Sequence, residues 1–196
     1  MGMPEGKKID FPLPPNLPVP SDDGAANHLE GIALPPVSLA STAGMLVDVS
    51  RLGHKGRVVI FCYPMTGVPG QPLPEGWDMI PGARGCTPQT CGFRDLYKEF
   101  QGLKVEVFGC STQTTEYQKE MADRLHVPFQ ILSDADFKLT DAIHLPTFDV
   151  DGKRLLRRLT MVIGADRIEH VFYPVFPPNE SADEVMRWVR AHPAAE

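Results

Sequence analysis

Residues 85–95 read Gly-Cys-Thr-Pro-Gln-Thr-Cys-Gly-Phe-Arg-Asp and place two cysteines five positions apart where a loop gives way to a helix. The threonine and proline that follow Cys86 mark the start of this helix. A helix N-terminus carries roughly half a positive charge and unpaired backbone N–H groups, so it favours an anion. A thiol there loses its proton more easily, and the thiolate is the reactive form. The segment predicts a redox-active or nucleophilic cysteine.

The chain around this segment alternates strand and helix patterns. A continuous apolar run over residues 57–63 is typical of a strand buried on both faces. Residues 88–100 have the apolar spacing of a helix. We expect further strands over 104–110 and 129–132, helices over 115–125, 136–143 and 181–191, and a hairpin over 160–163 and 168–173. This order predicts an α/β fold with a mixed central sheet and helices on both faces.

Two proline-rich stretches stand apart from this pattern. Eight of the twenty prolines precede Val37, so residues 1–30 are expected to form an extended segment that wraps the domain or stays mobile. An SH3-type peptide ligand is a minor alternative for this segment. Residues 31–196 are assigned to one domain. A second stretch between Pro64 and Pro88 is a long loop of a kind that is often functional.

Composition narrows the class of protein. The net charge of −6 argues against a nucleic-acid surface, and no apolar run approaches the roughly 20 residues that cross a bilayer. The N-terminus lacks the apolar core of a secretory signal, so we expect a cytoplasmic protein. Four cysteines are too few for a disulfide scaffold. In a reducing compartment, two cysteines close together in the sequence are more often catalytic or metal-binding than structural.

The four cysteines allow several interpretations. Cys62 lies in an apolar strand and fits a small buried hydrophobe, whereas Cys110 ends a strand and is ambiguous. Zinc would need a second ligand pair beside Cys86 and Cys91, and the six histidines are scattered singly, so no metal is predicted. Within one helix, five residues separate the two Cα atoms by roughly 8 to 9 Å. A disulfide needs less than about 7 Å, so this pair closes only if the first turn unwinds.

The segment 85–95 resembles the active-site segment of the peroxiredoxins of the bacterioferritin-comigratory-protein or PrxQ type. The resemblance extends from about Leu34 to the last helix. It includes Val58-Val-Ile-Phe-Cys-Tyr-Pro64, Phe108-Gly-Cys-Ser-Thr112, Val127-Pro-Phe-Gln-Ile-Leu-Ser-Asp134 and Arg158-Leu-Thr-Met-Val-Ile163. Several motifs in the right order make this match more specific than a single pair of cysteines.

The resemblance implies a thioredoxin-like fold and a thiol peroxidase for hydrogen peroxide and organic hydroperoxides, without a metal or organic cofactor. It implies that Cys86 is the peroxidatic cysteine and that Cys91 is the resolving one. Arg158 would match the arginine that stabilises thiolate and peroxide; otherwise it would be a solvated charge beside Arg154 and Arg157. Implied partners are the hydroperoxide and thioredoxin or a similar dithiol reductant, with a monomer or weak homodimer.

The chain departs from the family pattern just before Cys86. The usual motif is Pro-x-x-x-Thr-x-x-Cys, but Ala83 stands at the threonine position and an insertion, roughly residues 65–85, follows Pro64. Thr66 or Thr87 is a candidate for the missing hydroxyl. Trp77 and Ile80 are expected to wall the pocket or to form a partner surface.

Three other activities stay open at this point. The first is a one-cysteine peroxidase on the same fold, with Cys91 merely buried. The second is a thiol redox sensor or interaction module that oxidises once without turnover. A disulfide oxidoreductase is disfavoured, because such enzymes use the C-x-x-C spacing.

Overall fold

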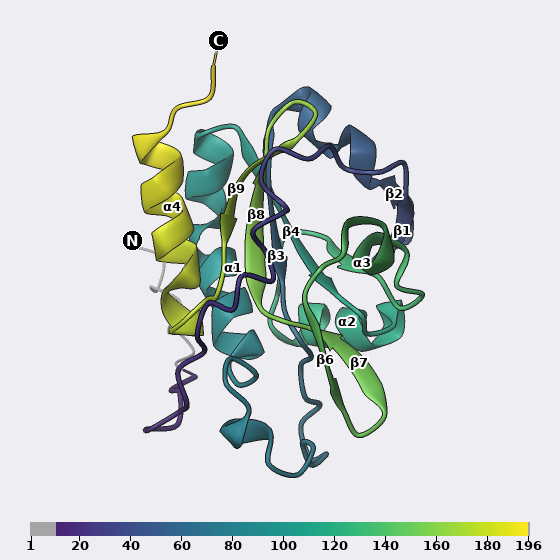
Figure 1. Ribbon diagram of the computed structural model, residues 1–196, viewed down its shortest axis with the longest axis vertical. Helices are drawn as coiled ribbons and strands as arrows, with labels where there is room; N and C mark the ends of the chain where they lie inside the picture. The colour runs from purple at the N-terminus through teal and green to yellow at the C-terminus, as the bar shows by residue number, and fades with distance from the viewer. Residues whose placement is uncertain (1–10, 196) are drawn as a thin grey trace, which may run out of the picture.

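The structure is a computed structural model that describes residues 11–195. Its centre is a seven-stranded sheet with the strand order β2-β1-β5-β4-β3-β8-β9, accompanied by a two-stranded β6-β7 ribbon (Figure 1). The strands are β1 (Ser38–Ser41), β2 (Leu46–Asp48), β3 (Arg57–Cys62), β4 (Val105–Ser111), β5 (Ile131–Ser133), β6 (Thr147–Val150), β7 (Lys153–Leu156), β8 (Leu159–Ile163) and β9 (Ile168–Phe172).

The helices are α1 (Cys86–Gly102), α2 (Thr115–Arg124), α3 (Lys138–Ile143) and α4 (Ser181–Ala191), with short 3-10 turns η1 (Val49–Lys55), η2 (Trp77–Met79) and η3 (Pro178–Glu180). No helix in the described part of the chain is long and apolar enough to cross a membrane.

The middle of the sheet follows from its apolar sequence. All six residues of β3 are buried, as expected for a strand with neighbours and packed layers on both sides. It pairs in parallel with β4 and antiparallel with β8, so the predicted mixed sheet is confirmed. The predicted hairpin is also confirmed as β8 and β9.

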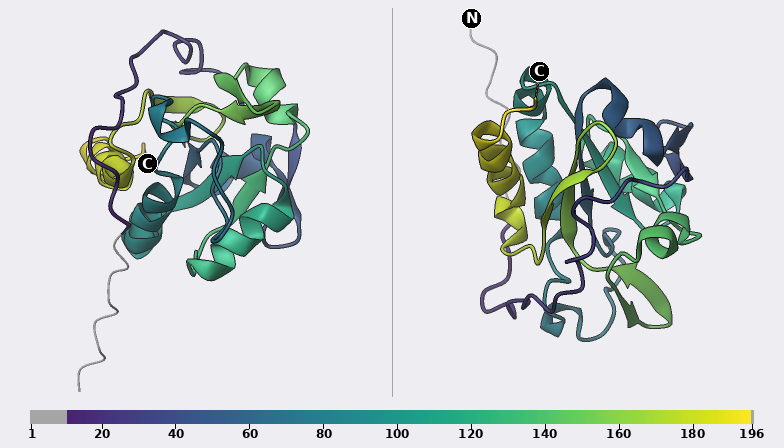
Figure 2. Two further views of the ribbon diagram at one scale, coloured as in Figure 1. Left: turned by 90° about the horizontal axis from the view of Figure 1, so that it is seen from below. Right: turned by 45° about the horizontal axis from the view of Figure 1, so that its top comes forward.

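Side chains that alternate along β3 point into two separate cores. Val59, Phe61 and Tyr63 pack with α1, α2 and α4, whereas Val58, Ile60 and Cys62 pack with η1, α3 and the chain before β1. Figure 2 shows the sheet lying between these two layers. The predicted covering of both faces is therefore confirmed, with the larger helices on one side.

The sequence interpretation missed four strands. β1 and β2 are short and partly exposed, so they lack an apolar run. The β6-β7 ribbon turns at Asp151-Gly152, and both residues have positive φ. Asp-Gly between two strand-like runs is a strong hairpin signal, and it was available in the sequence. The helix predicted over 88–100 begins earlier, at Cys86, which makes Cys86 its first residue.

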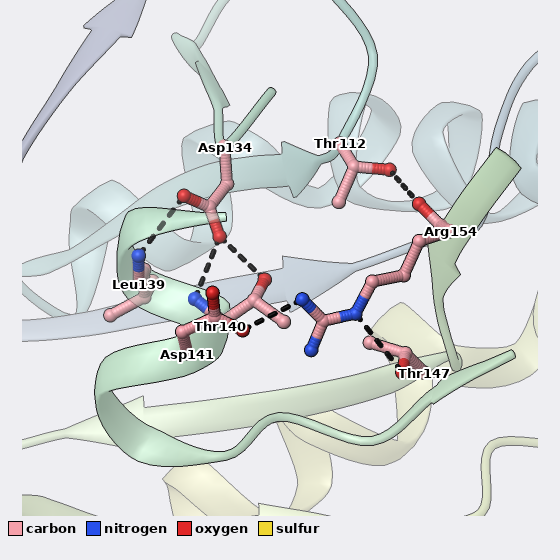
Figure 3. A network of polar contacts seen from close by, with 7 residues as sticks. All are labelled: Thr112, Asp134, Leu139, Thr140, Asp141, Thr147 and Arg154. Carbon is pink, nitrogen blue, oxygen red and sulfur yellow. Dashed lines mark hydrogen bonds and ion pairs between the residues drawn. The ribbon is translucent and has the colours of Figure 1, made fainter. Parts of the chain in front are cut away.

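A polar network fixes the β6-β7 ribbon to the sheet (Figure 3). Arg154 of β7 donates to the Asp141 carboxylate of α3 at 2.7 Å, and its carbonyl accepts from the Thr112 hydroxyl at 2.9 Å. Asp134 accepts from the backbone N–H groups of Leu139 and Thr140 at 3.0 and 2.7 Å and so holds the start of α3. The ribbon ends at Leu156, two residues before Arg158.

Residues 11–32, which we call the N-terminal strap, contain no helix or strand and lie on the domain. The Tyr173 hydroxyl donates to Asp23 at 2.9 Å, and Gly31 and Ile32 exchange backbone hydrogen bonds with Ile168. In Figure 1 the strap crosses in front of the sheet from the lower end of α4 toward β1. Its first residues therefore reach the start of α1. The predicted extension includes residues 1–10, which lie outside the described residues, and the boundary at residue 30 stays a prediction.

Candidate active site

Cys86 opens α1 directly after Gly85, which has a φ of +114°. Only glycine adopts this backbone conformation readily. A Cβ on Gly85 would also overlap Pro178 and would lie 3.2 Å from Cδ2 of Leu13. Gly85 is thus enclosed by the strap on one side and by η3 on the other. This enclosure fixes the backbone that presents the Cys86 thiol at the positive end of the helix.

Arg158 lies against the Cys86 sulfur. Its Nη2 is 3.2 Å from Cys86 Sγ and donates to the Ala83 carbonyl at 2.9 Å. Its Nε donates to the Gly82 carbonyl at 3.3 Å. These two carbonyls belong to the end of the insertion, so the insertion helps to hold the guanidinium. The structure brings together Cys86 and Arg158, although 72 residues separate them.

Arg158 is 3% exposed, yet its protein acceptors are neutral. Besides the two carbonyls, Nη1 donates to Oε1 of Gln89 at 2.5 Å, and no carboxylate contacts the guanidinium among the described residues. A buried charge without a counterion is strongly unfavourable. A Cys86 thiolate would supply the missing negative charge at 3.2 Å. A guanidinium at this distance can stabilise negative charge that develops on the cysteine sulfur during a reaction.

The three arginines of the 154–158 cluster have different environments. Arg154 forms an ion pair with Asp141, and Arg157 lies over the Phe148 ring at 5.5 Å. Arg158 alone of the three is buried against a cysteine. The interpretation of Arg158 as a solvated charge is therefore wrong.

Cys91 lies five residues further along α1 and is 6% exposed. Burial raises the pKa of the Cys91 thiol, and nearby Arg94 opposes this shift. Both cysteines are helical and free, so the helix geometry keeps their Cα atoms too far apart for a disulfide. Cys91 is therefore both distant and protonated while the first turn of α1 is intact.

The two candidate threonines occupy different places. Thr66 is buried, and its backbone N–H and hydroxyl interact with Oε1 of Gln113 at 3.0 and 3.3 Å. Thr87 is the second residue of α1. Both line the same cavity as Cys86, but no hydrogen bond joins either hydroxyl to Cys86 Sγ in the described part of the chain. Which of them contacts the peroxide stays a prediction.

Cys62 and Cys110 form a second pair on the other face of the sheet. They are register partners on the parallel strands β3 and β4, and neither has any exposed surface. A hydrogen bond with Cys62, together with burial, raises the pKa of Cys110 well above its usual range. Both belong to the core opposite to that of Cys86 and Cys91. Cys110 is therefore not placed to react with Cys86.

Two cavities flank the segment that carries Cys86. The first, of about 390 Å³, lies between the strap, the insertion and the start of α1, and both Cys86 and Trp77 line it. The second, of about 340 Å³, is lined by Ile80, Gly82 and Arg158. Trp77 and Ile80 thus line pockets beside Cys86 and Arg158, as one of the two sequence interpretations predicts. Within residues 11–195, no cluster of side chains has the composition of a metal site.

Sequence reasoning missed two contributors to the site. Gln89 accepts from Arg158 and donates to the Ser181 hydroxyl at 3.2 Å, which links α1 to α4. Its position three residues after Cys86 places it on the same helix face, and this spacing was a usable signal. The Ala83 carbonyl is the other contributor, and a backbone group leaves no trace in the side-chain pattern.

Comparisons with known proteins agree with this geometry. The redoxin family matches residues 29–186. Chloroplastic peroxiredoxin Q of Sedum lineare is 29% identical over 179 residues, which cover 90% of this chain and 86% of that relative. Peroxiredoxin Bcp of Escherichia coli K12 is 29% identical over 171 residues, covering 83% and 96%. The solved structure of peroxidoxin BcpB from Mycobacterium tuberculosis has a TM-score of 0.68 and 27% identity, covering 85% and 100%.

The fold and the paired thiol and guanidinium define a thiol-dependent peroxidase with a thioredoxin-like fold. The chain belongs to the redoxin family, and its relatives and structural neighbours are peroxiredoxins of the Q and Bcp type. The family and the fold implied by the sequence motifs are thereby confirmed.

Proposed function

We propose that Cys86 is the peroxidatic residue of a two-cysteine peroxiredoxin and that Cys91 resolves its sulfenic acid. The observation that carries this assignment is the contact of 3.2 Å between Cys86 Sγ and the buried Arg158 guanidinium. Arg158 faces the positions that the thiolate and the peroxide oxygens would share. Its role is to stabilise negative charge as the oxygen–oxygen bond breaks.

The first step consumes one hydroperoxide. The Cys86 thiolate attacks the terminal oxygen of ROOH, the oxygen–oxygen bond breaks, and RO⁻ leaves and takes a proton from water to give ROH. Cys86 retains the transferred OH as a sulfenic acid. The proposed hydroxyl partner in this step is Thr66 or Thr87, because both line the cavity onto which Cys86 opens.

The second step requires a change in the helix. Cys91 attacks the sulfenic sulfur, a disulfide forms, and water leaves. The first turn of α1 must unwind for this step. Unwinding shortens the distance between the two sulfurs and exposes the Cys91 thiol. It thereby removes the burial that raises the pKa of this thiol. A dithiol protein such as thioredoxin then reduces the disulfide by thiol exchange.

We also propose that the protein works in the cytoplasm as a monomer or weak homodimer. Four cysteines are too few for a disulfide scaffold, which supports a reducing compartment. Val175 and Pro178 of the apolar stretch 171–178 are buried within this chain, which supports its use in the protein's own core. Some relatives are chloroplastic, so fractionation of the source cells is the direct test of location.

Intact mass spectrometry after one equivalent of hydrogen peroxide tests the two-cysteine cycle. The reduced wild type should lose two hydrogens, and Cys91→Ser should instead gain one oxygen. A wild type that gains one or two oxygens under these conditions contradicts resolution by Cys91 and supports the one-cysteine alternative. Sustained peroxide consumption with thioredoxin and its reductase separates both enzymes from a sensor that oxidises once.

A further inference from the structure

The second cavity, of about 340 Å³, is separate from the cavity onto which Cys86 opens. None of the described residues lines both cavities. Its wall comes from the strap, the end of the insertion, β6, the segment between β7 and β8, and the turn after β9. The reaction proposed above places no substrate in this cavity, so its lining calls for a separate explanation.

Two consecutive arginines, Arg157 and Arg158, belong to this lining. The Arg157 guanidinium lies 5.5 Å from the centroid of the Phe148 ring, and no ion pair joins it to an acid anywhere in residues 11–195. Arg158 is buried against neutral acceptors, as described above. The wall of the cavity therefore contains two guanidinium groups that lack a carboxylate partner.

Asp23 is the one acid that the described residues contribute to this wall. Its carboxylate accepts from the backbone N–H of Ala25 at 3.1 Å and from the Tyr173 hydroxyl at 2.9 Å. These hydrogen bonds hold the pKa of Asp23 below its usual value, so the carboxylate is charged at neutral pH. Two positive groups and one negative group leave the lining with a net positive charge, which attracts an anion.

The rest of the wall is mostly apolar. Its main apolar contributors are Val19, Ile80, Phe148, Pro174 and Val175. An apolar lining with a few charged groups at fixed places is typical of a small-molecule site, and the volume lies in the usual range for such sites. The lining thus matches a ligand that has one anionic end and one apolar end.

We propose that the second cavity binds a small organic monocarboxylate, with its carboxylate against Arg157 and Arg158 and its apolar group beside Phe148. A guanidinium presents its N–H donors in a planar fork that matches the two oxygens of a carboxylate. Of the five N–H bonds of Arg158, four are directed at the contacts already described, which leaves one at Nη1 for a ligand. This site goes beyond the peroxidase reaction and does not depend on it.

Calorimetric titration of benzoate into the reduced, full-length protein tests the site. Benzoate should bind saturably at one site with a Kd of about 1 mM or tighter. Benzamide keeps the ring but has no charge, and acetate keeps the charge but has no ring. Each should bind at least about tenfold more weakly than benzoate. The titration involves no peroxide, so its result is independent of whether the proposed peroxidase function is correct.

Two variants locate the bound benzoate, and circular dichroism checks that each is folded. Arg157→Met should weaken benzoate binding at least about tenfold, because it removes a charged donor and keeps apolar bulk. Arg187→Met is the matched control, since Arg187 is exposed on α4 and does not line the cavity. Asp23→Asn should strengthen binding about twofold, because it removes a repelling charge and keeps an acceptor for Tyr173.

Other results would contradict the proposal in distinct ways. A lack of saturable benzoate binding would overturn the site itself. Equal affinities for benzoate and benzamide would overturn the carboxylate class, and equal affinities for benzoate and acetate would overturn the apolar contact. Equal affinities in Arg157→Met and Arg187→Met would place benzoate elsewhere on the protein. If Arg157→Met does not fold, weaker binding in Asp23→Asn than in the wild type would still contradict the charge argument.

Discussion

The two cysteine pairs differ in spacing and in surroundings, and the more closely spaced pair is the one less suited to react. Cys62 and Cys110 are register partners on adjacent strands, which lie about 4.8 Å apart. Cys86 and Cys91 are separated by five helical residues, roughly 8 to 9 Å. The closer pair is sealed in the core, whereas Cys86 of the distant pair opens onto a cavity beside a guanidinium.

The two pairs therefore differ in expected reactivity because of the groups around their thiols, not because of the distance between their sulfurs. Cys86 has the Arg158 guanidinium 3.2 Å from its sulfur. Cys110 has another thiol as its neighbour, and this contact and burial both keep it protonated. A distant pair can react in sequence when the element between the two thiols can unwind, and strands in the middle of a sheet cannot do so locally.

The largest expected effect is on the rate of peroxide consumption, and it distinguishes the two cysteine pairs. Cys86→Ser should lower the rate of peroxide consumption by at least about 10³-fold, because the nucleophile is lost. Cys110→Ala should retain a rate within about twofold of the wild type, and an assay with hydrogen peroxide and dithiothreitol measures both. A comparable loss in Cys110→Ala would show that the two pairs are not functionally distinct.

Removal of the guanidinium should have the next largest effect. Arg158→Met should slow the oxidation of Cys86 roughly 10²-fold, since the charge that stabilises the thiolate and the transition state is gone. Stopped-flow oxidation of the reduced protein measures this rate. Arg190→Met is the matched control, because Arg190 forms an exposed ion pair with Glu99. Equal rates in the two variants would remove Arg158 from the reaction.

A smaller effect is expected at the residue that orients Arg158. Gln89→Leu should lower the oxidation rate about tenfold, because Nη1 of Arg158 loses its acceptor. Gln89→Glu keeps an oxygen at this place but brings a carboxylate against Arg158, which would compete with Cys86 for the guanidinium, so this variant should not restore the rate. Gln101→Leu, on the exposed end of the same helix, is the control. A wild-type rate in the Glu variant would contradict the role of Arg158 as a charge without a carboxylate partner.

The smallest effect concerns stability at alkaline pH. The pKa values of Cys91 and Cys110 are raised, so the folded state binds these protons more tightly than the unfolded chain. This stability is fully present below the unfolded pKa of roughly 8.5 and falls as pH rises, by up to about 1.4 kcal/mol per pH unit for each thiol. Urea unfolding with a reductant at pH 8 and pH 10 measures the loss.

The variant Cys110→Ala sharpens this measurement. Its free energy of unfolding should fall by about 2 kcal/mol less than that of the wild type between pH 8 and pH 10, since one buried thiol no longer titrates. An identical fall in both proteins would show that Cys110 is not held in the protonated form by the fold.

The sequence revealed the parts of the protein that have regular patterns. The continuous apolar run of β3 and the helical spacing of α1 were readable, and the motif around Cys86 led to the correct family. The four short strands were missed, and β1 and β2 are stabilised by pairing with distant segments rather than by their own composition. The place of Arg158 was available only through the resemblance, because burial of one arginine among three depends on tertiary packing.

The position of Arg158 has a consequence for the design of inhibitors. The residue contacts Cys86, while the second cavity, lined by Ile80 and Gly82, reaches it independently of the first. A compound bound in this second cavity and drawing the guanidinium away from the sulfur would slow oxidation without occupying the place of the peroxide. We expect such inhibition to be noncompetitive with peroxide, whereas an electrophile that enters by the first cavity would compete with it.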